Sequence, residues 1–432
     1  MLSLLFGMET LPFISADEAV RVVRSGDHVH LSSIASVPHI LIEALCRRAG
    51  ELRDVHFHHF HTEGPAPYGS AEYEGVFFDQ GFFVGPNLRE SVRLGVADYL
   101  PAHLWESQRM YRSGVLPCDV AMVQVSEPVD GMVSLGTSVD CSVAALEVAR
   151  DRIAVVNHNV PFALGDLIPI ERFTALVKDD RPLITKDYVQ PSEVELAIGR
   201  NCSELVPDGA CLQMGIGALP NAVCASLKNH QHLGLHTEMF ADGALDLIWK
   251  GVIDGSRKLI DKGQVVASFL LGSQRVYDFI HNNPDVRMRD IAYTNDPLII
   301  SRNPRVVSIN SAVEIDLTGQ VCADSIGERI YSGTGGQLDF VRGAKLSPGG
   351  KSIIALASRT AHGAPKIVPV LKPGAGVVTP RADVEWVVTE YGSVNLWGKS
   401  LQERAKLLIS IAHPEDREAL ERAAFERFGR LI

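Results

Sequence analysis

The sequence contains no apolar run that approaches the roughly 18 residues needed to span a membrane. The segment from Met1 to Pro12 is briefly apolar, but it lacks the basic region and the long apolar core of a secretory signal peptide. Positive charge is in deficit, since 41 Lys and Arg stand against 52 Asp and Glu and give a formal net charge of -11. This balance argues against a general nucleic-acid-binding protein, which usually carries a basic face. We therefore expect neither a nucleic-acid partner nor a membrane segment.

The number and spacing of the cysteines indicate neither a disulfide framework nor a cysteine-based zinc site. The number of cysteines is odd, their spacing is scattered and no CxxC pair occurs; they are Cys46, Cys118, Cys141, Cys202, Cys211, Cys224 and Cys322. Such usage is typical of a reduced, intracellular protein. We expect a soluble cytoplasmic protein.

The chain alternates strand-like and helix-like segments. Its 432 residues suggest two or three domains, and a hydrophobic content of 46% is sufficient for large cores. Apolar strand-like runs occur at 120–125, 153–156 and 353–356, with helix-like patterns between them. This alternation predicts an α/β fold with a largely parallel sheet.

An internal near-repeat divides the chain into two halves. Residues 25–45 and 208–227 both have a turn glycine, a strand, a loop of small residues and a helix with proline near its first turn, at an offset of 183 between Gly26 and Gly209. A second pair, 120–136 and 306–327, has an offset of 186. We expect two related open α/β domains, 1–190 and 191–432, with the site in the cleft between them. The alternative explanation of the near-repeat is that all α/β units resemble one another, whether or not the halves are related.

Three helix starts are visible locally. Ser192 is a plausible N-cap just after the join between the halves, Ser400 and Glu403 have the spacing of a capping box, and Pro414 opens a charged amphipathic helix near the end of the chain.

Two His-Thr-Glu tripeptides could carry a catalytic carboxylate. In HLGLHTEMFADG (232–243), Glu238 is expected at the carboxyl end of a strand, where open α/β sheets bind ligands. A glutamate there can act as a base or as a covalent nucleophile. Glu63 stands in the same tripeptide in the first half, and a helix-capping or ion-paired role is equally open for either residue. Local sequence does not choose between them.

Four histidines precede Glu63 and invite a metal-binding interpretation. On a strand, however, His56 and His58 face one side while His59 and His61 face the other, and no third ligand has a suitable spacing. We expect pocket lining or strand packing, and no metal.

Two glycine-containing loops are candidate ligand-binding segments. QMGIGALPNAV (213–223) leads from a strand into a helix, and helix N-termini with exposed N–H groups favour anions. YSGTGGQLDF (331–340) contains three glycines that let the backbone approach a ligand closely. An ordinary α/β turn and a flexible hairpin turn are the respective alternatives.

Taken together, these motifs resemble the acetyl-CoA hydrolase/transferase family of class I CoA-transferases. Within it, the sequence is most similar to 4-hydroxybutyrate CoA-transferases and butyryl-CoA:acetate CoA-transferases. The resemblance runs through nine ordered segments: HTEGPAPY (61–68), FFVGPNLRESV (82–92), DYLP (98–101), SLGTSVD (134–140), QMGIGALPNAV (213–223), GLHTEMFADG (234–243), INSAVEIDLTGQV (309–321), SGTGGQLDF (332–340) and 387–418.

The resemblance implies a fold of two open α/β domains with the site between them. It assigns the glutamate nucleophile to Glu238 and so decides against Glu63. It assigns the coenzyme A (CoA) contacts to Gly215, Ile216, Gly217, Ala218, Leu219, Val313 and Gly336, with Gln213 and Gly335 as supporting loop residues. CoA is then a substrate, and no permanently bound cofactor is expected. Acyl-CoA and short-chain carboxylates are the expected partners of a homodimer or homotetramer.

The implied chemistry is acyl-CoA:carboxylate CoA transfer by a ping-pong mechanism through a glutamyl-CoA thioester. An ordinary glutamate has a pKa near 4.3, so it is expected to be an anion at pH 7 and to need no general base. An acyl-CoA hydrolase with the same nucleophile and a CoA-binding regulatory protein are the alternatives. For the CoA phosphates, Lys351 and Arg359 follow the second glycine loop, although a solvated surface position is the favoured explanation for each.

Overall fold

The first half of the chain builds a seven-stranded, fully parallel sheet. The computed structural model describes residues 11–429. In spatial order the strands are β4 (Ala97–Tyr99), β3 (Phe77–Gly81), β2 (Val55–His58), β1 (His28–Leu31), β5 (Val120–Val125), β7 (Asp151–Val156) and β9 (Ala175–Lys178). Strand β5 is an interior strand and is buried along its whole length, as its largely apolar sequence VAMVQV predicts.

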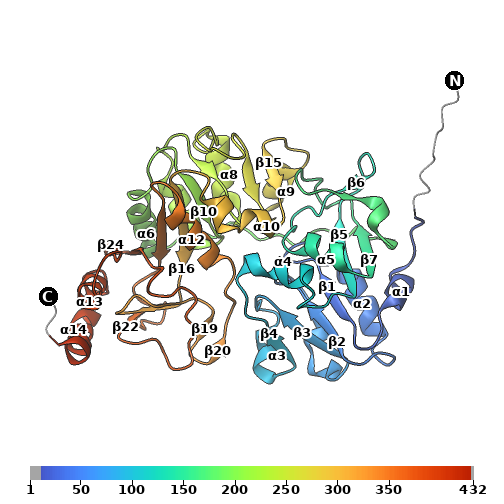
Figure 1. Cartoon of the computed structure of the whole chain (residues 1–432), viewed down its shortest axis with the longest axis horizontal. Helices are drawn as coiled ribbons and strands as arrows, with labels where there is room; N and C mark the ends of the chain where they lie inside the picture. Colours follow the sequence, from blue (N-terminus) through green and yellow to red (C-terminus); the bar gives the residue numbers. More distant parts are fainter. Residues whose placement is uncertain (1–10, 430–432) are drawn as a thin grey trace.

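The second half builds a six-stranded sheet beside the first (Figure 1). Its order is β11 (Gly234–Leu235), β10 (Cys211–Met214), β16 (Val306–Ser311), β21 (Lys351–Ala355), β23 (Trp386–Thr389) and β24 (Gly392–Asn395). All neighbours are parallel except β23 and β24, which form an antiparallel edge pair.

The two sheets share one topology. The order β2-β1-β5-β7-β9 in the first corresponds to β11-β10-β16-β21-β23 in the second. The sequence repeats fall on β1 and β10 and on β5 and β16, which are adjacent strands in both sheets. The two His-Thr-Glu tripeptides follow β2 and β11, so they occupy corresponding places in the two halves. The predicted architecture of two related α/β domains is therefore confirmed.

Helices cover the sheets, and the remaining short strands form separate small sheets of two or three strands. The helices are α1 (Ala16–Ala19), α2 (His39–Arg47), α3 (Arg89–Leu94), α4 (Leu104–Arg112), α5 (Ser142–Val148), α6 (Glu193–Ser203), α7 (Ala218–Ser226), α8 (Asp242–Trp249), α9 (Gln274–Ile280), α10 (Ile291–Thr294), α11 (Pro297–Ile300), α12 (Gln337–Leu346), α13 (Leu401–Ser410) and α14 (Pro414–Phe428). The remaining strands are β6 (Met132–Val133), β8 (Ile168–Pro169), β12 (Met239–Phe240), β13 (Val265–Ala267), β14 (Phe269–Leu270), β15 (Val286–Met288), β17 (Glu314–Asp316), β18 (Val321–Cys322), β19 (Ser325–Ile326), β20 (Arg329–Ile330) and β22 (Ile367–Val368).

The helix starts predicted from local sequence are confirmed. Ser192 caps α6 and Ser400 caps α13, each within a complete capping box, and Pro414 is the first residue of α14. No helix within residues 11–429 has the length and apolar character required to cross a membrane.

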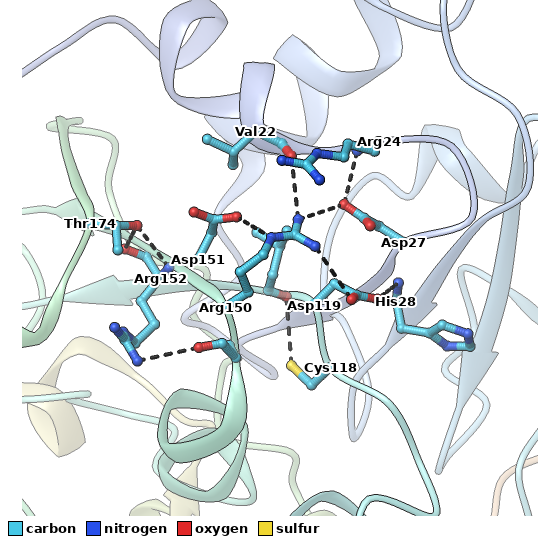
Figure 2. Close-up of polar contacts among 12 residues, drawn as sticks. Val22, Arg24, Asp27, His28, Cys118, Asp119, Arg150, Asp151, Arg152 and Thr174 are labelled. Carbon is cyan, nitrogen blue, oxygen red and sulfur yellow. Dashed lines mark hydrogen bonds and ion pairs between the residues drawn. The ribbon is translucent and has the colours of Figure 1, made fainter.

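An arginine ties together the amino-terminal ends of three strands in the first sheet (Figure 2). The Arg150 guanidinium lies 2.7 Å from Asp151, 3.0 Å from Asp27 and 3.4 Å from Asp119, which stand just before or at the start of β7, β1 and β5. In the second sheet Arg305, not an aspartate, precedes β16, so this network is not repeated. These charges lie at the amino ends of the strands, whereas the tripeptides lie beyond the carboxyl ends.

Candidate functional site

Glu238 lies just beyond the carboxyl end of β11, and its backbone is held from three sides. The N–H groups of Ser268 and Phe269 donate to its carbonyl oxygen at 3.0 and 2.9 Å. The preceding Thr237 hydroxyl donates to the Met214 carbonyl at 2.9 Å, and a ring nitrogen of buried His236 lies 2.9 Å from the Thr294 carbonyl oxygen. These hydrogen bonds fix where the Glu238 side chain emerges.

The Glu238 carboxylate has one side-chain hydrogen-bond donor. The Asn295 amide nitrogen donates to Glu238 Oε2 at 2.9 Å. Burial nevertheless raises the pKa of Glu238 to about 7, since the surroundings supply no cation to offset the lost hydration. The sequence-based expectation of an ordinary, fully ionised glutamate at neutral pH is therefore wrong, because burial favours the protonated form of this carboxyl.

Glu238 faces a cavity of about 270 Å³ between the two halves. Its lining comprises Phe83, Gly215, Ile216, Leu219, Pro220, Glu238, Ile309, Asn310, Ser311, Ala323, Ser332, Gly333, Thr334, Gly335, Gly336 and Gln337. Both glycine loops predicted from the sequence meet here around the carboxylate. Phe83 comes from the first half of the chain, and Glu238 is the only ionisable residue in the set.

Gly336 is a glycine because the side chains of Glu238 and Asn295 pass directly against its Cα. A Cβ at this position would overlap Glu238 Oε2 and the Asn295 amide nitrogen. At Gly333 a Cβ would lie 2.8 Å from the Phe82 carbonyl oxygen of the other half. Close backbone approach thus accounts for these two glycines of the second loop.

Backbone contacts dock the second glycine loop onto the first half. The Val84 N–H donates to the Ser332 carbonyl at 2.9 Å, and the Leu104 N–H donates to the Gly335 carbonyl at 3.0 Å. The Thr334 N–H donates to the Tyr99 hydroxyl oxygen at 2.8 Å. The loop is therefore held from both halves, and its geometry depends on how they sit together.

Glu63, the competing carboxylate, lies in a different environment. A His61 ring nitrogen and Lys186 Nζ each lie 2.8 Å from its Oε1. Burial alone would raise the pKa of Glu63, but the hydrogen bonds from His61 and Lys186 outweigh it and lower the pKa to about 2. Glu63 is not among the cavity-lining residues, and its carboxylate is engaged in an ion-paired cluster.

The four histidines before Glu63 have separate polar partners. His59 pairs with Asp79 at 2.7 Å, His61 pairs with Glu63, His58 contacts His28 at 2.8 Å, and His56 contacts Gln80 at 3.1 Å. Across residues 11–429, a metal-like grouping of potential ligands occurs at His30, Asp140 and Cys141. His30 is hydrogen-bonded to Tyr111 and Ser142, and Asp140 accepts hydrogen bonds from Ser138 and Ser142. These contacts indicate a structural polar network.

Four of the predicted CoA-site residues do not line this cavity. Gly217 lines a smaller adjoining hollow, Ala218 is the first residue of α7, and the Val313 N–H donates to the Cys322 carbonyl. Gln213 is buried and exchanges amide hydrogen bonds with Asn310 at 3.1 and 3.3 Å. It therefore supports Asn310, which does line the cavity.

The two cationic side chains suggested to contact the CoA phosphates, Lys351 and Arg359, form other interactions. Lys351 Nζ donates to the Leu205 carbonyl at 2.7 Å. Arg359 forms a bidentate pair with Asp416 at 2.7 and 2.9 Å and contacts Glu415 at 2.6 Å. The alternative of ordinary structural positions therefore describes both residues.

Sequence reasoning missed Asn295 and did not single out Asp339 or Phe83 within its quoted segments. Asn295 lies in the Thr-Asn-Asp-Pro turn after α10, which marks a turn but not a partner for a glutamate 57 positions away. The fold alone brings these residues to Glu238.

Comparison with known proteins agrees with this geometry. Profiles of the acetyl-CoA hydrolase/transferase N-terminal and C-terminal domains match residues 10–190 and 272–424. A succinyl-CoA:acetate/propanoyl-CoA:succinate CoA transferase from Fasciola hepatica is 45% identical over 420 residues, which cover 96% of this chain and 87% of that protein. A 4-hydroxybutyrate coenzyme A transferase from Clostridium kluyveri is 42% identical over 418 residues, which cover 96% of this chain and 97% of that protein.

A solved structure shows the same fold. The crystal structure of 4-hydroxybutyrate CoA-transferase from Porphyromonas gingivalis has a TM-score of 0.82 and 38% identity, and covers 96% of this chain and 98% of that chain. Fold and relatives together define an enzyme of the CoA-transferase class. The chain belongs to the acetyl-CoA hydrolase/transferase family.

Proposed function

We propose that this enzyme is an acyl-CoA:carboxylate CoA-transferase for short-chain acids, with Glu238 as its covalent nucleophile. The observation that carries the proposal is the Glu238 carboxylate, held by Asn295 at the wall of a cavity framed by both glycine loops. A carboxylate in that position can attack a thioester carbonyl, and neighbouring N–H groups can stabilise the charge that develops on the carbonyl oxygen.

The reaction proceeds in two half-reactions. A Glu238 oxygen attacks the acyl-CoA carbonyl carbon, the C–S bond breaks, and the CoA thiolate leaves behind an acyl-glutamyl anhydride. The thiolate then attacks the glutamyl carbonyl, which releases the donor carboxylate and leaves CoA bound to Glu238 as a thioester. The acceptor carboxylate reverses both steps and leaves as the new acyl-CoA, so the kinetics are ping-pong.

The cavity wall supports an assignment of roles within the loops. Gly215, Ile216, Gly217, Ala218 and Leu219 form the strand-to-helix turn before and into α7, and we assign this turn to CoA. Gly336 adjoins the carboxylate and Gly335 lines the same cavity, so their backbone is assigned to the reacting carbonyl. The loss of one such donor typically costs about 10²- to 10³-fold in rate.

Charge in the cavity favours monocarboxylic acyl groups. Glu238 is the only ionisable residue in the lining. The second carboxylate of a succinyl group would lie there without a cation, and an unpaired buried charge costs several kcal/mol. We therefore assign butyrate or 4-hydroxybutyrate as acyl groups with acetyl-CoA and acetate as the exchange partners, in line with the name of the Clostridium kluyveri relative.

The test is an incubation of the purified enzyme with butyryl-CoA, with and without acetate. Mass spectrometry follows both the CoA products and the peptide that contains Glu238. Transfer predicts acetate-dependent acetyl-CoA and a CoA-sized adduct on Glu238 that Glu238→Gln abolishes. Glu63→Gln is the matched control, and it should retain the adduct.

Other outcomes point to other functions. Free CoA released at a comparable rate without acetate identifies a hydrolase. An adduct on Glu63 refutes the assignment of the nucleophile. An absence of turnover with butyryl-, 4-hydroxybutyryl-, acetyl- and succinyl-CoA favours a CoA-binding regulatory protein.

A further inference from the structure

Asp339 has a buried carboxyl that is linked to the Glu238 carboxylate through one residue, Asn295. It stands in the first turn of α12, is 5% exposed, and does not line the cavity. An aspartate at this helical position ordinarily stabilises its own helix N-terminus from the surface. Here, however, its hydrogen bonds go to other elements, which calls for a different explanation.

One oxygen of Asp339 joins the two halves of the chain. The Trp105 N–H, in the first turn of α4, donates to Asp339 Oδ2 at 3.0 Å. The N-cap of α4, His103, supplies no side-chain acceptor of its own. Asp339 therefore acts as the acceptor for α4, although the two residues are 234 positions apart.

The same oxygen also accepts from the Asn295 amide, whose NH2 group has two N–H donors and so can serve Asp339 and Glu238 together. Asn295 Nδ2 donates to Glu238 Oε2 at 2.9 Å and lies 3.3 Å from Asp339 Oδ2. The Thr294 hydroxyl donates to the side-chain amide oxygen of Asn295, Oδ1, at 3.0 Å, so the amide orientation is defined at both ends. The shorter contact goes to Glu238 while Trp105 also occupies Asp339.

These hydrogen bonds link the contact between the two halves to the side-chain donor of Glu238. With the halves docked, Asp339 Oδ2 accepts the Trp105 N–H and one N–H of the Asn295 amide, and the second N–H of that amide is available to Glu238. If the halves separate at this point, Asp339 loses the Trp105 contact that holds it, and the Asn295 amide that it orients shifts with it. Glu238 then loses its one side-chain donor and is less readily ionised.

We propose that Asp339 is a positioning residue that couples the docking of the two halves, through Asn295, to the readiness of Glu238 for attack. The inference rests on the function proposed for Glu238. Burial raises the pKa of Asp339 well above its usual range, and the negative charges of Glu238 and Glu106 raise it further. Either protonation state leaves Oδ2 able to accept the two N–H groups.

The first test compares Asp339→Ala with Asp339→Asn. The alanine removes the acceptor, whereas the asparagine keeps an oxygen that can accept from both partners. We expect Asp339→Ala to slow formation of the Glu238–CoA adduct by about 10- to 100-fold, a typical cost of misplaced catalytic groups, with KM for acyl-CoA changed less than about twofold. Asp339→Asn should restore most of the rate. Glu106→Gln, which changes a charge on α4 without a hydrogen bond to Asp339, should behave as wild type.

The second test isolates the backbone donor at Trp105. Trp105→Pro removes the N–H at a first-turn position that tolerates proline, and Trp105→Ala removes the same side chain but keeps the N–H. We expect the rise of kcat/KM with pH to move to higher pH in Trp105→Pro only. Combined with Asp339→Ala, Trp105→Pro should add little further loss, because the two changes break one contact.

Several results would overturn the inference. They are a wild-type adduct rate in folded Asp339→Ala, equal losses in Asp339→Ala and Asp339→Asn, and identical pH profiles for Trp105→Pro and Trp105→Ala. If Asp339→Ala fails to fold, the comparison of Trp105→Pro with Trp105→Ala tests the inference by itself. A wild-type enzyme that forms no Glu238 adduct would refute the proposed function, and this inference with it.

Discussion

The buried carboxyl of Glu238 should destabilise the folded enzyme at neutral and alkaline pH. The perturbation that exposes this effect is Glu238→Gln, which keeps an oxygen acceptor for Asn295 and removes the charge. In the folded protein the pKa of Glu238 is about 7, against 4.5 for an unperturbed glutamate. Between these values the native state holds a proton that the unfolded chain releases, so stability falls as pH rises.

The magnitude follows from the difference between the two pKa values. A shift from 4.5 to about 7 corresponds to a destabilisation of about 3 kcal/mol once both states are ionised, at about 1.4 kcal/mol per pKa unit. By the same relation, the penalty is about 1 kcal/mol at pH 5 and nearly complete at pH 8. The glutamine variant should therefore gain stability over wild type, and the gain should grow by about 2 kcal/mol between pH 5 and pH 8.

Urea-induced unfolding without substrate, followed by tryptophan fluorescence at pH 5 and pH 8, measures this gain. Glu63→Gln is a control for which the expected change in stability has the opposite sign. The pKa of Glu63 is lowered to about 2, so its charge contributes stability that is present above the unfolded value of 4.5 and is lost only as pH falls toward 2. Glu63→Gln should thus be less stable than wild type by nearly the same amount at pH 5 and pH 8.

Equal stability of Glu238→Gln and wild type at both pH values would refute the reasoning. It would mean that Glu238 is hydrated or ion-paired in the folded protein, contrary to the cavity described above. A constant gain at both pH values would point instead to better packing of the amide.

Three further predictions concern activity. The kcat/KM for acyl-CoA should rise with pH through about 7, because burial raises the pKa of Glu238 to that value and attack requires the ionised form; a profile that is flat from pH 5.5 to 8.5 would contradict this. Gly336→Ala should lower kcat by at least about 10²-fold, because its Cβ overlaps Glu238 and Asn295, whereas Gly50→Ala, where a Cβ meets open space, should leave steady-state rates unchanged. Arg359→Ala should leave KM for acyl-CoA within about twofold, because the guanidinium is bound to Asp416 and Glu415; a tenfold rise in KM would show that it contacts the CoA phosphates.

Much of the fold was predictable because its determinants are local. The alternation of apolar runs with helical periodicity indicated α/β units, and the offsets of 183 and 186 residues located corresponding strands in two halves. Capping boxes at Ser192 and Ser400 were identifiable because an N-cap and its partner lie three residues apart.

The choice between the two tripeptides was not predictable from the residues themselves. Glu63 and Glu238 follow corresponding strands of related sheets, so local sequence gives them the same backbone setting. Only resemblance to a known family distinguished them, and it carried no physical reason for the difference.

The tertiary structure supplies that reason. Lys186 reaches Glu63 from 123 residues away and holds its pKa low, whereas Asn295 and Gly336 enclose Glu238 without a cation and burial raises its pKa. A sequence by itself determines which segments form strands, helices and caps, since these depend on neighbours within a few residues. The ionisation of a carboxyl depends on which distant groups the fold brings within hydrogen-bond distance, and so it was decided only by the tertiary packing around each glutamate.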